Sequence, residues 1–153
     1  GKPHVRPYWN NGVFFGTINV IFCQSRWHHM FRTFLALGGI NAMLAVALGA
    51  FGAHGLKGHI ADRLMAAYET GVQYHMAHAL GLIAVALVAD KLGERPTIRW
   101  SGRLLMTGIV LFSGSLYVMG LSGVEALGIV TPLGGVSFLA GWVLLVVSAL
   151  KRS

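Results

Sequence analysis

Residues 132–150 read PLGGVSFLAGWVLLVVSAL, nineteen residues without a single charged side chain. As an α-helix, this stretch would be about 28 Å long, close to the ~30 Å thickness of the hydrocarbon core of a bilayer. An uncharged apolar run of this length is typical of a transmembrane helix. The stretch therefore predicts a membrane protein.

Three further apolar stretches of similar length precede it, at about residues 31–53, 71–89 and 101–121. We expect the second to extend backwards as an amphipathic helix from Asp62, whose side chain can cap the helix. Thr131 and Pro132 suit the start of the fourth in the same way. Residues 123–130 predict a short interfacial or re-entrant segment, with a longer Pro-kinked helix as the alternative. The predicted fold is all-α, a polytopic bundle of four transmembrane helices.

The composition agrees with a membrane protein and argues against a soluble one. Hydrophobic residues make up 55% of the 153 residues and charged residues only 11%, whereas soluble domains carry about 25% charged residues. The net charge is +7, from 12 Lys and Arg against 5 Asp and Glu. The basic residues flank the apolar runs and form no stripe with interleaved aromatics, so we expect membrane lipid as a partner and no nucleic acid.

Residues 1–29 differ from the rest of the chain. Their apolar run, residues 12–23, is too short to span a bilayer, and no small-x-small cleavage site follows it. Met30 directly precedes the first predicted span. We therefore interpret residues 1–29 as an extension of doubtful origin (a leader, an added segment or mis-called upstream translation), with an interfacial helix or strand as the alternative. Residues 30–153 form the predicted four-span domain.

The distribution of Lys and Arg predicts the orientation of the chain. The N-terminal segment carries four, the second connection four and the C-terminal tail two, which makes ten on one side. The first connection carries Lys57 and Arg63, and the third carries none. Because basic residues are enriched on the cytoplasmic side, we expect both termini in the cytoplasm.

Small residues within the spans predict close helix packing. Gly, Ala and Ser recur at near-helical spacing in spans one, three and four, and such residues let membrane helices approach each other. About 120 residues in four helices make a thin bundle. We therefore expect a homo-oligomer or a membrane-protein partner.

Polar side chains in the first two spans are the main functional candidates, because burying them in hydrocarbon is costly. His75 and His78 share one face of a helix, and Glu69 and Gln73 form a second row. We expect this group on the non-cytoplasmic half of the membrane. Three interpretations remain open: a structural polar cluster, a transition-metal or haem site through three histidines, and a proton-relay or substrate site. The candidate set is His54, Glu69, Gln73, Tyr74, His75 and His78.

Asn41, near the middle of span one, is predicted to bond across helices, with a place in a transport path as the alternative. No acidic residue lies deep in a span, and the chain has neither paired carboxylates nor a Ser, His and Asp set of credible spacing. Its single cysteine, Cys23, excludes a cysteine-based metal site. The sequence therefore predicts no catalytic residue and no metal ligand set of its own, and it leaves any cofactor unknown.

Four motifs resemble those of one family. They are LGAFGAHGL at 48–56, YETGVQYHMAH at 68–78, LFSGSLY at 111–117 and TPLGGVSFLAGW at 131–142. Together they are similar to the domain of unknown function 423 family, the YgdD-like bacterial inner-membrane proteins, to which the transmembrane protein 256 group is related. The resemblance covers about residues 30–150 and implies a multi-pass protein of the bacterial cytoplasmic membrane. It adds Ser113, Ser115, Tyr117, Thr131 and Pro132 as candidate interhelical polar or packing residues.

The resemblance supplies no established activity. We expect a non-enzymatic structural, assembly or stress-related factor, because no catalytic constellation is recognisable. A small-solute or ion transporter acting as an oligomer is the first alternative. A haem- or metal-binding membrane protein through His54, His75 and His78 is the second.

Overall fold

The computed structural model describes residues 11–151, with side chains from residue 29 onward, and this part of the chain is helical without strands. Within this described part, four helices are long and apolar enough to cross a membrane: residues 29–56, 62–92, 96–122 and 125–150. These ranges contain the four predicted spans. The prediction of an all-α, four-span membrane protein is therefore confirmed.

The four spans are built from five α-helices and three short irregular helical segments. The first is α1 (Asn11–Phe51), which continues into the π-helical η1 (Gly52–Leu56), and the second is α2 (Asp62–Leu92). The third consists of α3 (Pro96–Gly108), the π-helical η2 (Ile109–Ser113) and α4 (Gly114–Ser122). The fourth consists of the 3₁₀-helical η3 (Glu125–Ile129) followed by α5 (Thr131–Leu150).

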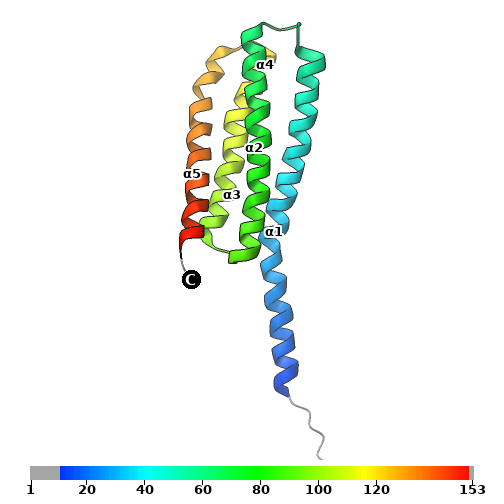
Figure 1. The fold of residues 1–153 in the computed structure, drawn as a ribbon, viewed down its shortest axis with the longest axis vertical. Coiled ribbons are helices and arrows are strands. Elements are labelled where there is room, and N and C mark those ends of the chain that lie inside the picture. Colours follow the sequence, from blue (N-terminus) through cyan, green and yellow to red (C-terminus); the bar gives the residue numbers. More distant parts are fainter. Residues whose placement is uncertain (1–10, 152–153) are drawn as a thin grey trace, which may run out of the picture.

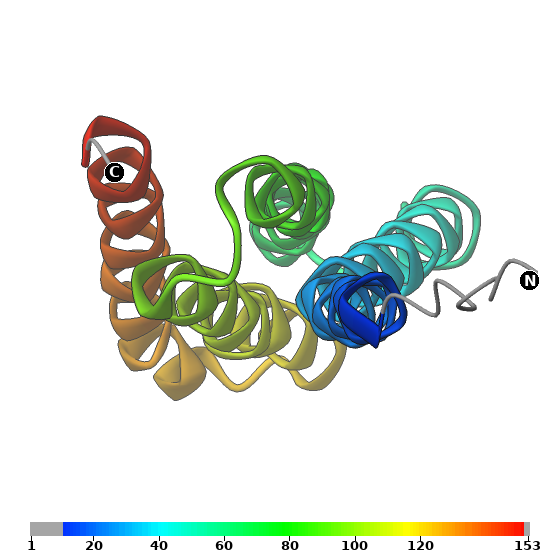
Figure 2. The same cartoon turned by 90° about the horizontal axis from the view of Figure 1, so that it is seen from below.

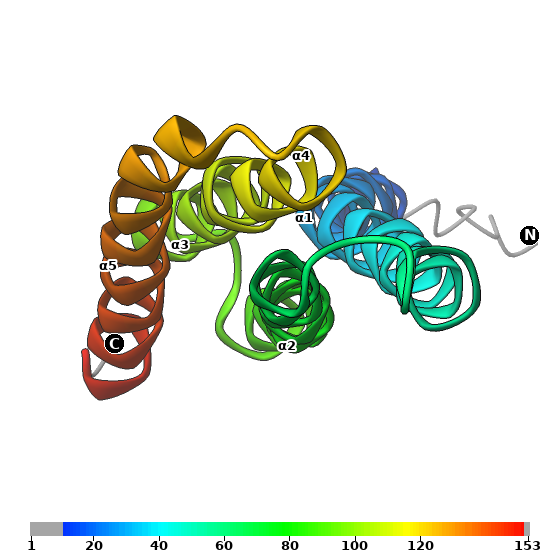
Figure 3. The ribbon, with the colours of Figure 1, turned by 90° about the horizontal axis from the view of Figure 1, so that it is seen from above.

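Consecutive spans run antiparallel and are joined by short connections (Figure 1). Seen end-on, α1, the α3–α4 span and α5 follow one another, and α2 lies against one side of this row (Figures 2 and 3). The α1–α2 and α4–α5 connections share one end of the bundle, which we call the Arg63 end. The α2–α3 connection and Lys151 lie at the other, which we call the Arg95 end.

α1 begins well before the predicted first span. It is a single helix of 41 residues, and its N-terminal part extends below the rest of the bundle in Figure 1. Residues 1–10 lie outside the described part of the chain. The boundary that we expected at residue 30 falls inside this helix, and the origin of residues 1–29 stays a prediction.

Two of the expected helix caps are wrong. Ala61 occupies the N-cap of α2, so that Asp62 is already helical, and no side chain caps this end. Val130 occupies the N-cap of α5, and the Thr131 hydroxyl bonds to another helix instead. The segment that we expected to be interfacial or re-entrant forms the 3₁₀ turn η3. Asp62 and Thr131 each lie one residue past the position from which a side chain caps a helix.

The turns at the ends of α2 and α4 require glycine. Gly93 and Gly123 have φ values of 81° and 71°, a region that side chains with a Cβ rarely adopt. The N–H of Gly123 donates to the carbonyl of Met119 at 2.9 Å and so satisfies the end of α4. Each glycine ends its helix abruptly, which permits the short antiparallel connection.

Glycines also bring the helices together within the membrane. A Cβ on Gly134 would lie 2.4 Å from the backbone nitrogen of Phe112, so α5 touches the backbone of η2. A Cβ on Gly38 would lie 2.6 Å from the side chain of Ile83, and one on Gly102 would lie 2.3 Å from the ring of Phe34. These glycines confirm the predicted close packing. Gly114 differs, because nothing lies within 4 Å of its Cβ position.

Candidate functional site

Three polar side chains meet in the interior of the bundle, each from a different span. His75 of α2 lies between Asn41 of α1 and Tyr117 of α4. Its Nε2 is 3.0 Å from Asn41 Oδ1, and its Nδ1 is 3.0 Å from the Tyr117 hydroxyl. Only 4% of the surface of Asn41 and of His75 is exposed. We call these three residues the central polar cluster.

The hydrogen-bond partners assign the state of the imidazole. Asn41 Oδ1 can only accept, while Asn41 Nδ2 donates to the Leu37 carbonyl at 2.8 Å and approaches Met106 Sδ at 3.5 Å. His75 Nε2 must therefore carry the proton that Asn41 accepts. In a neutral ring Nδ1 then accepts from the Tyr117 hydroxyl. Every polar atom of the His75 and Asn41 side chains thus has a partner within the bundle.

The central polar cluster lies near the middle of the membrane spans. Asn41 precedes His54 by thirteen residues, which corresponds to about 20 Å along the helix. His75 pairs with Asn41, so it lies at the depth of Asn41 and far from His54. We expected His54, Glu69, Gln73, Tyr74, His75 and His78 together at one level of the bundle, on its non-cytoplasmic half. The register between α1 and α2 places Glu69 and Gln73 beside Gly49 and Gly52, near the end of the first span, but places His75 beside Asn41. The grouping is therefore wrong for His75 and His78, and the side of the membrane stays a prediction.

His78 lies one turn beyond His75 and faces α5. Its ring stacks on Phe138 with centroids 3.4 Å apart and an interplanar angle of 11°. Its Nδ1 lies 2.7 Å from the carbonyl oxygen of Tyr74 on its own helix. Because a carbonyl oxygen can only accept, Nδ1 carries the proton and donates it. Tyr74 is 43% exposed, and its ring packs on Phe112. His78 therefore serves as a packing contact between α2 and α5.

Glu69, Gln73 and His54 lie outside this interior. All three are exposed. Glu69 and Gln73 line a shallow groove of about 180 Å³ beside Gly49 and Gly52 of the first span. The groove opens on the surface of the bundle, nearer the Arg63 end than the central polar cluster. His54 lies in η1 and does not line it.

A pair of hydroxyl groups joins α4 to α5. Ser115 Oγ lies 2.8 Å from Thr131 Oγ1 and also donates to the Phe112 carbonyl at 2.9 Å. Pro132 next to it is exposed. Ser113 is fully buried at the end of η2. Its hydroxyl has no hydrogen-bond partner, and among the described residues no other fully buried side-chain nitrogen or oxygen lacks one.

The sequence did not indicate several other polar contacts. Tyr68, which is fully buried, donates its hydroxyl to the Leu48 carbonyl at 2.9 Å. Ser101 of α3 donates to the Gly141 carbonyl at 2.7 Å. Arg95 donates to the Ser148 and Lys151 carbonyls, at 3.2 and 3.1 Å, and so satisfies the end of α5. The small-x₃-small spacing of α5 was the available signal for the Ser101 contact.

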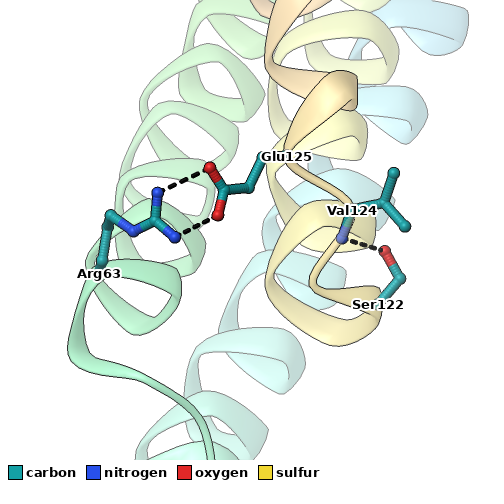
Figure 4. A network of polar contacts seen from close by, with 4 residues as sticks. All are labelled: Arg63, Ser122, Val124 and Glu125. Carbon is teal, nitrogen blue, oxygen red and sulfur yellow. Dashed lines mark hydrogen bonds and ion pairs between the residues drawn. The ribbon is translucent and has the colours of Figure 1, made fainter.

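At the Arg63 end, an ion pair joins the N-terminus of α2 to η3. The Arg63 guanidinium faces both carboxylate oxygens of Glu125, and the neighbouring Ser122 hydroxyl accepts the N–H of Val124 at 3.2 Å (Figure 4). The two charged side chains are 71% and 56% exposed. Such an exposed pair contributes little to stability.

The histidines do not assemble into a ligand set. Both nitrogens of His75 are engaged within the central polar cluster, and His54 is far from it. Among residues 29–151, no group of three or more His, Cys, Asp and Glu side chains could hold a metal ion. The central polar cluster instead connects three spans by hydrogen bonds.

Comparison with known proteins agrees with this architecture. Residues 48–135 match the family model "Protein of unknown function (DUF423)". The UPF0382 membrane protein YwdK of Bacillus subtilis is 54% identical over 120 residues, which cover 78% of this chain and 98% of the relative. A UPF0382 membrane protein of Staphylococcus epidermidis is 47% identical over 78% of this chain and 97% of its own. No solved structure matches the chain. The family model covers more than half of the chain, and the relatives are named membrane proteins, in agreement with the four apolar helices. This chain therefore belongs to the DUF423 family.

Proposed function

We propose that this chain is a non-catalytic protein of the bacterial inner membrane that acts as a small structural or assembly factor. One observation carries the proposal: the buried polar side chains of the spans bond to other side chains or to backbone carbonyls within the bundle. Apart from Ser113, each buried polar side chain among the described residues has a partner inside the bundle. Polar groups that are hydrogen-bonded within a bundle rigidify it, as expected of a structural role.

The proposed orientation places both termini in the cytoplasm. It is supported by the ten basic residues that flank the termini and the second connection, against two at the Arg63 end. The test uses a Cys23→Ser background with either Lys57→Cys or Lys91→Cys. A membrane-impermeant maleimide should label position 57 on intact cells and position 91 only after permeabilisation. The reverse pattern would invert the topology.

The proposed partner is a membrane protein or a second copy of the chain. The thin bundle supports this, since its first and last spans lie at opposite sides of the molecule (Figures 2 and 3). Cross-linking in native membranes, followed by affinity purification of a tagged chain, should give one defined complex or dimer. A chain that stays monomeric and enriches nothing beyond an untagged control would refute the assembly role.

A second candidate, a small-solute or ion transporter, is favoured by Ser113. Its unpaired hydroxyl lies at the end of a π-helical segment inside a transmembrane span, and π-helical turns are frequent at functional sites. Proteoliposomes loaded with pH- or ion-sensitive dyes provide the test. A flux that Ser113→Ala or His75→Gln reduces would support transport. Equal leakage from dye-loaded vesicles with and without the protein would refute it.

A further inference from the structure

A polar pocket of about 300 Å³ lies at the Arg95 end of the bundle, apart from the central polar cluster. His29 and Phe34 of α1 form one side of it, and Arg99 and Arg103 of α3 form the other. Glu94 of the α2–α3 connection lies between them. The pocket thus combines two guanidinium groups with an apolar wall at the end of a transmembrane bundle.

Arg103 is an exposed residue just inside the apolar part of the third span. It follows the first residue of α3 by seven positions, about 10 Å along the helix, and it lies within the predicted apolar span. Its guanidinium lies over the ring of Trp100 at 5.3 Å from the centroid. In the part of the chain whose side chains are described, it forms no ion pair with a carboxylate. A cation at this depth needs an anionic partner or access to the interface.

Glu94 does not supply that partner, because its two oxygens are engaged elsewhere. Oε1 accepts the backbone N–H of Met30 at 3.1 Å, and Oε2 lies 3.5 Å from the Arg99 guanidinium. These contacts tie α1 to the α2–α3 connection and hold Arg99 at the rim. With two guanidiniums against one carboxylate, the pocket has an excess of positive charge.

The apolar side of the pocket is closely packed. Phe34 and Met30 are only 6% and 4% exposed. Phe34 packs so closely on Gly102 that a Cβ there would lie 2.3 Å from its ring. On the outer side Trp100 is 54% exposed, as expected of an aromatic residue at the membrane interface. The charged groups therefore lie at the boundary between hydrocarbon and headgroups.

We propose that this pocket binds the phosphate of an anionic phospholipid, with Arg103 and Arg99 as the charged donors and an N–H of the His29 ring as a further hydrogen-bond donor. Guanidinium groups bind phosphate oxygens in a bidentate manner, and basic pockets at the membrane surface recognise phospholipid headgroups. A lipid phosphate is favoured over a soluble one because the Arg103 guanidinium lies over the interfacial Trp100, where the hydrocarbon meets the lipid headgroups. The site does not depend on the proposed assembly role.

The test measures lipid retention by the full chain with native mass spectrometry after exchange into nanodiscs of phosphatidylglycerol and phosphatidylcholine. We expect preferential retention of phosphatidylglycerol, with affinity reduced about tenfold by Arg103→Gln, since a charge-assisted bidentate contact is lost. Arg103→Lys retains the charge but not the bidentate geometry. Its affinity for phosphatidylglycerol should lie between those of the unsubstituted chain and Arg103→Gln. Lys91→Gln removes one charge at the same end without lining the pocket and should change affinity at most about fivefold, the effect of general surface attraction.

The results separate a specific site from general attraction. Equal retention by Arg103→Gln and the unsubstituted chain would overturn the proposal, as would equal losses in Arg103→Gln and Lys91→Gln. Competition by millimolar inorganic phosphate that fully displaces phosphatidylglycerol would overturn the lipid assignment and indicate a soluble phosphate ligand. If Arg103→Gln does not fold, as judged by its helical circular dichroism, a reduction by Arg103→Lys alone supports the site and no reduction refutes it.

Discussion

The centre of the bundle and its Arg63 end use similar polar side chains in opposite ways. At the centre, His75 is 4% exposed and bonds to Asn41 and Tyr117. At the Arg63 end, Arg63 and Glu125 form an ion pair while more than half of each side chain stays exposed. Within a bilayer no water replaces a lost hydrogen bond, whereas a charged group at the end can exchange its partner for solvent. Position along the span therefore decides whether a polar contact matters for folding.

Removing the imidazole of His75 should have the largest effect. His75→Ala leaves Asn41 Oδ1 and the Tyr117 hydroxyl without partners and opens a cavity, so we expect a loss of about 3 kcal/mol in the free energy of unfolding. Unfolding of the purified chain in mixed micelles with increasing SDS measures it. His54→Ala is the matched control, since His54 is exposed, and should be nearly neutral. Equal losses in both variants would contradict the comparison.

Replacing both partners of the α1–α2 contact should cost less than the sum of the single changes. We expect Asn41→Leu and His75→Leu to be coupled by about 1 kcal/mol, the scale of interhelical hydrogen bonds in membrane proteins. A double-mutant cycle of SDS unfolding gives this value. Strict additivity would show that the 3.0 Å contact between Asn41 and His75 contributes nothing.

Tyr117→Phe should destabilise the bundle by a smaller amount, about 1 kcal/mol, because it deletes one hydroxyl and keeps the ring. His75 Nδ1 is then the only atom that loses its partner. The same unfolding assay applies, with Tyr74→Phe as control, since Tyr74 is 43% exposed. A larger loss in Tyr74→Phe than in Tyr117→Phe would place the important tyrosine at the surface.

Breaking the exposed ion pair should have the smallest effect. Arg63→Gln and Glu125→Gln, singly or together, should leave the SDS unfolding midpoint unchanged, because an exposed pair contributes little and is screened by salt. The measurement is repeated at low and high ionic strength. A midpoint that is clearly lower in the variants than in the unsubstituted chain at low salt, with the difference vanishing at high salt, would mean that this ion pair helps to hold the α2–η3 junction.

The length and hydropathy of the chain predicted the spans because each is a property of contiguous residues. The pairing of Asn41 with His75 was not predictable, since it depends on how far α1 and α2 are displaced along each other. For the same reason the sequence placed His54 beside the span-two histidines. The roles of Tyr68 and Arg95 were missed because each bonds to a backbone carbonyl of another span, and carbonyls are present at every residue.

By itself the sequence determined that this chain crosses a membrane four times, because a run of about twenty mostly apolar residues is stable as a helix in hydrocarbon. It also determined where close approach is possible, since Gly38, Gly102 and Gly134 have no Cβ. Only the tertiary structure decided which polar groups meet. The register of the packed helices placed His75 between Asn41 and Tyr117 and left Arg103 facing a pocket without an acidic partner among the described side chains.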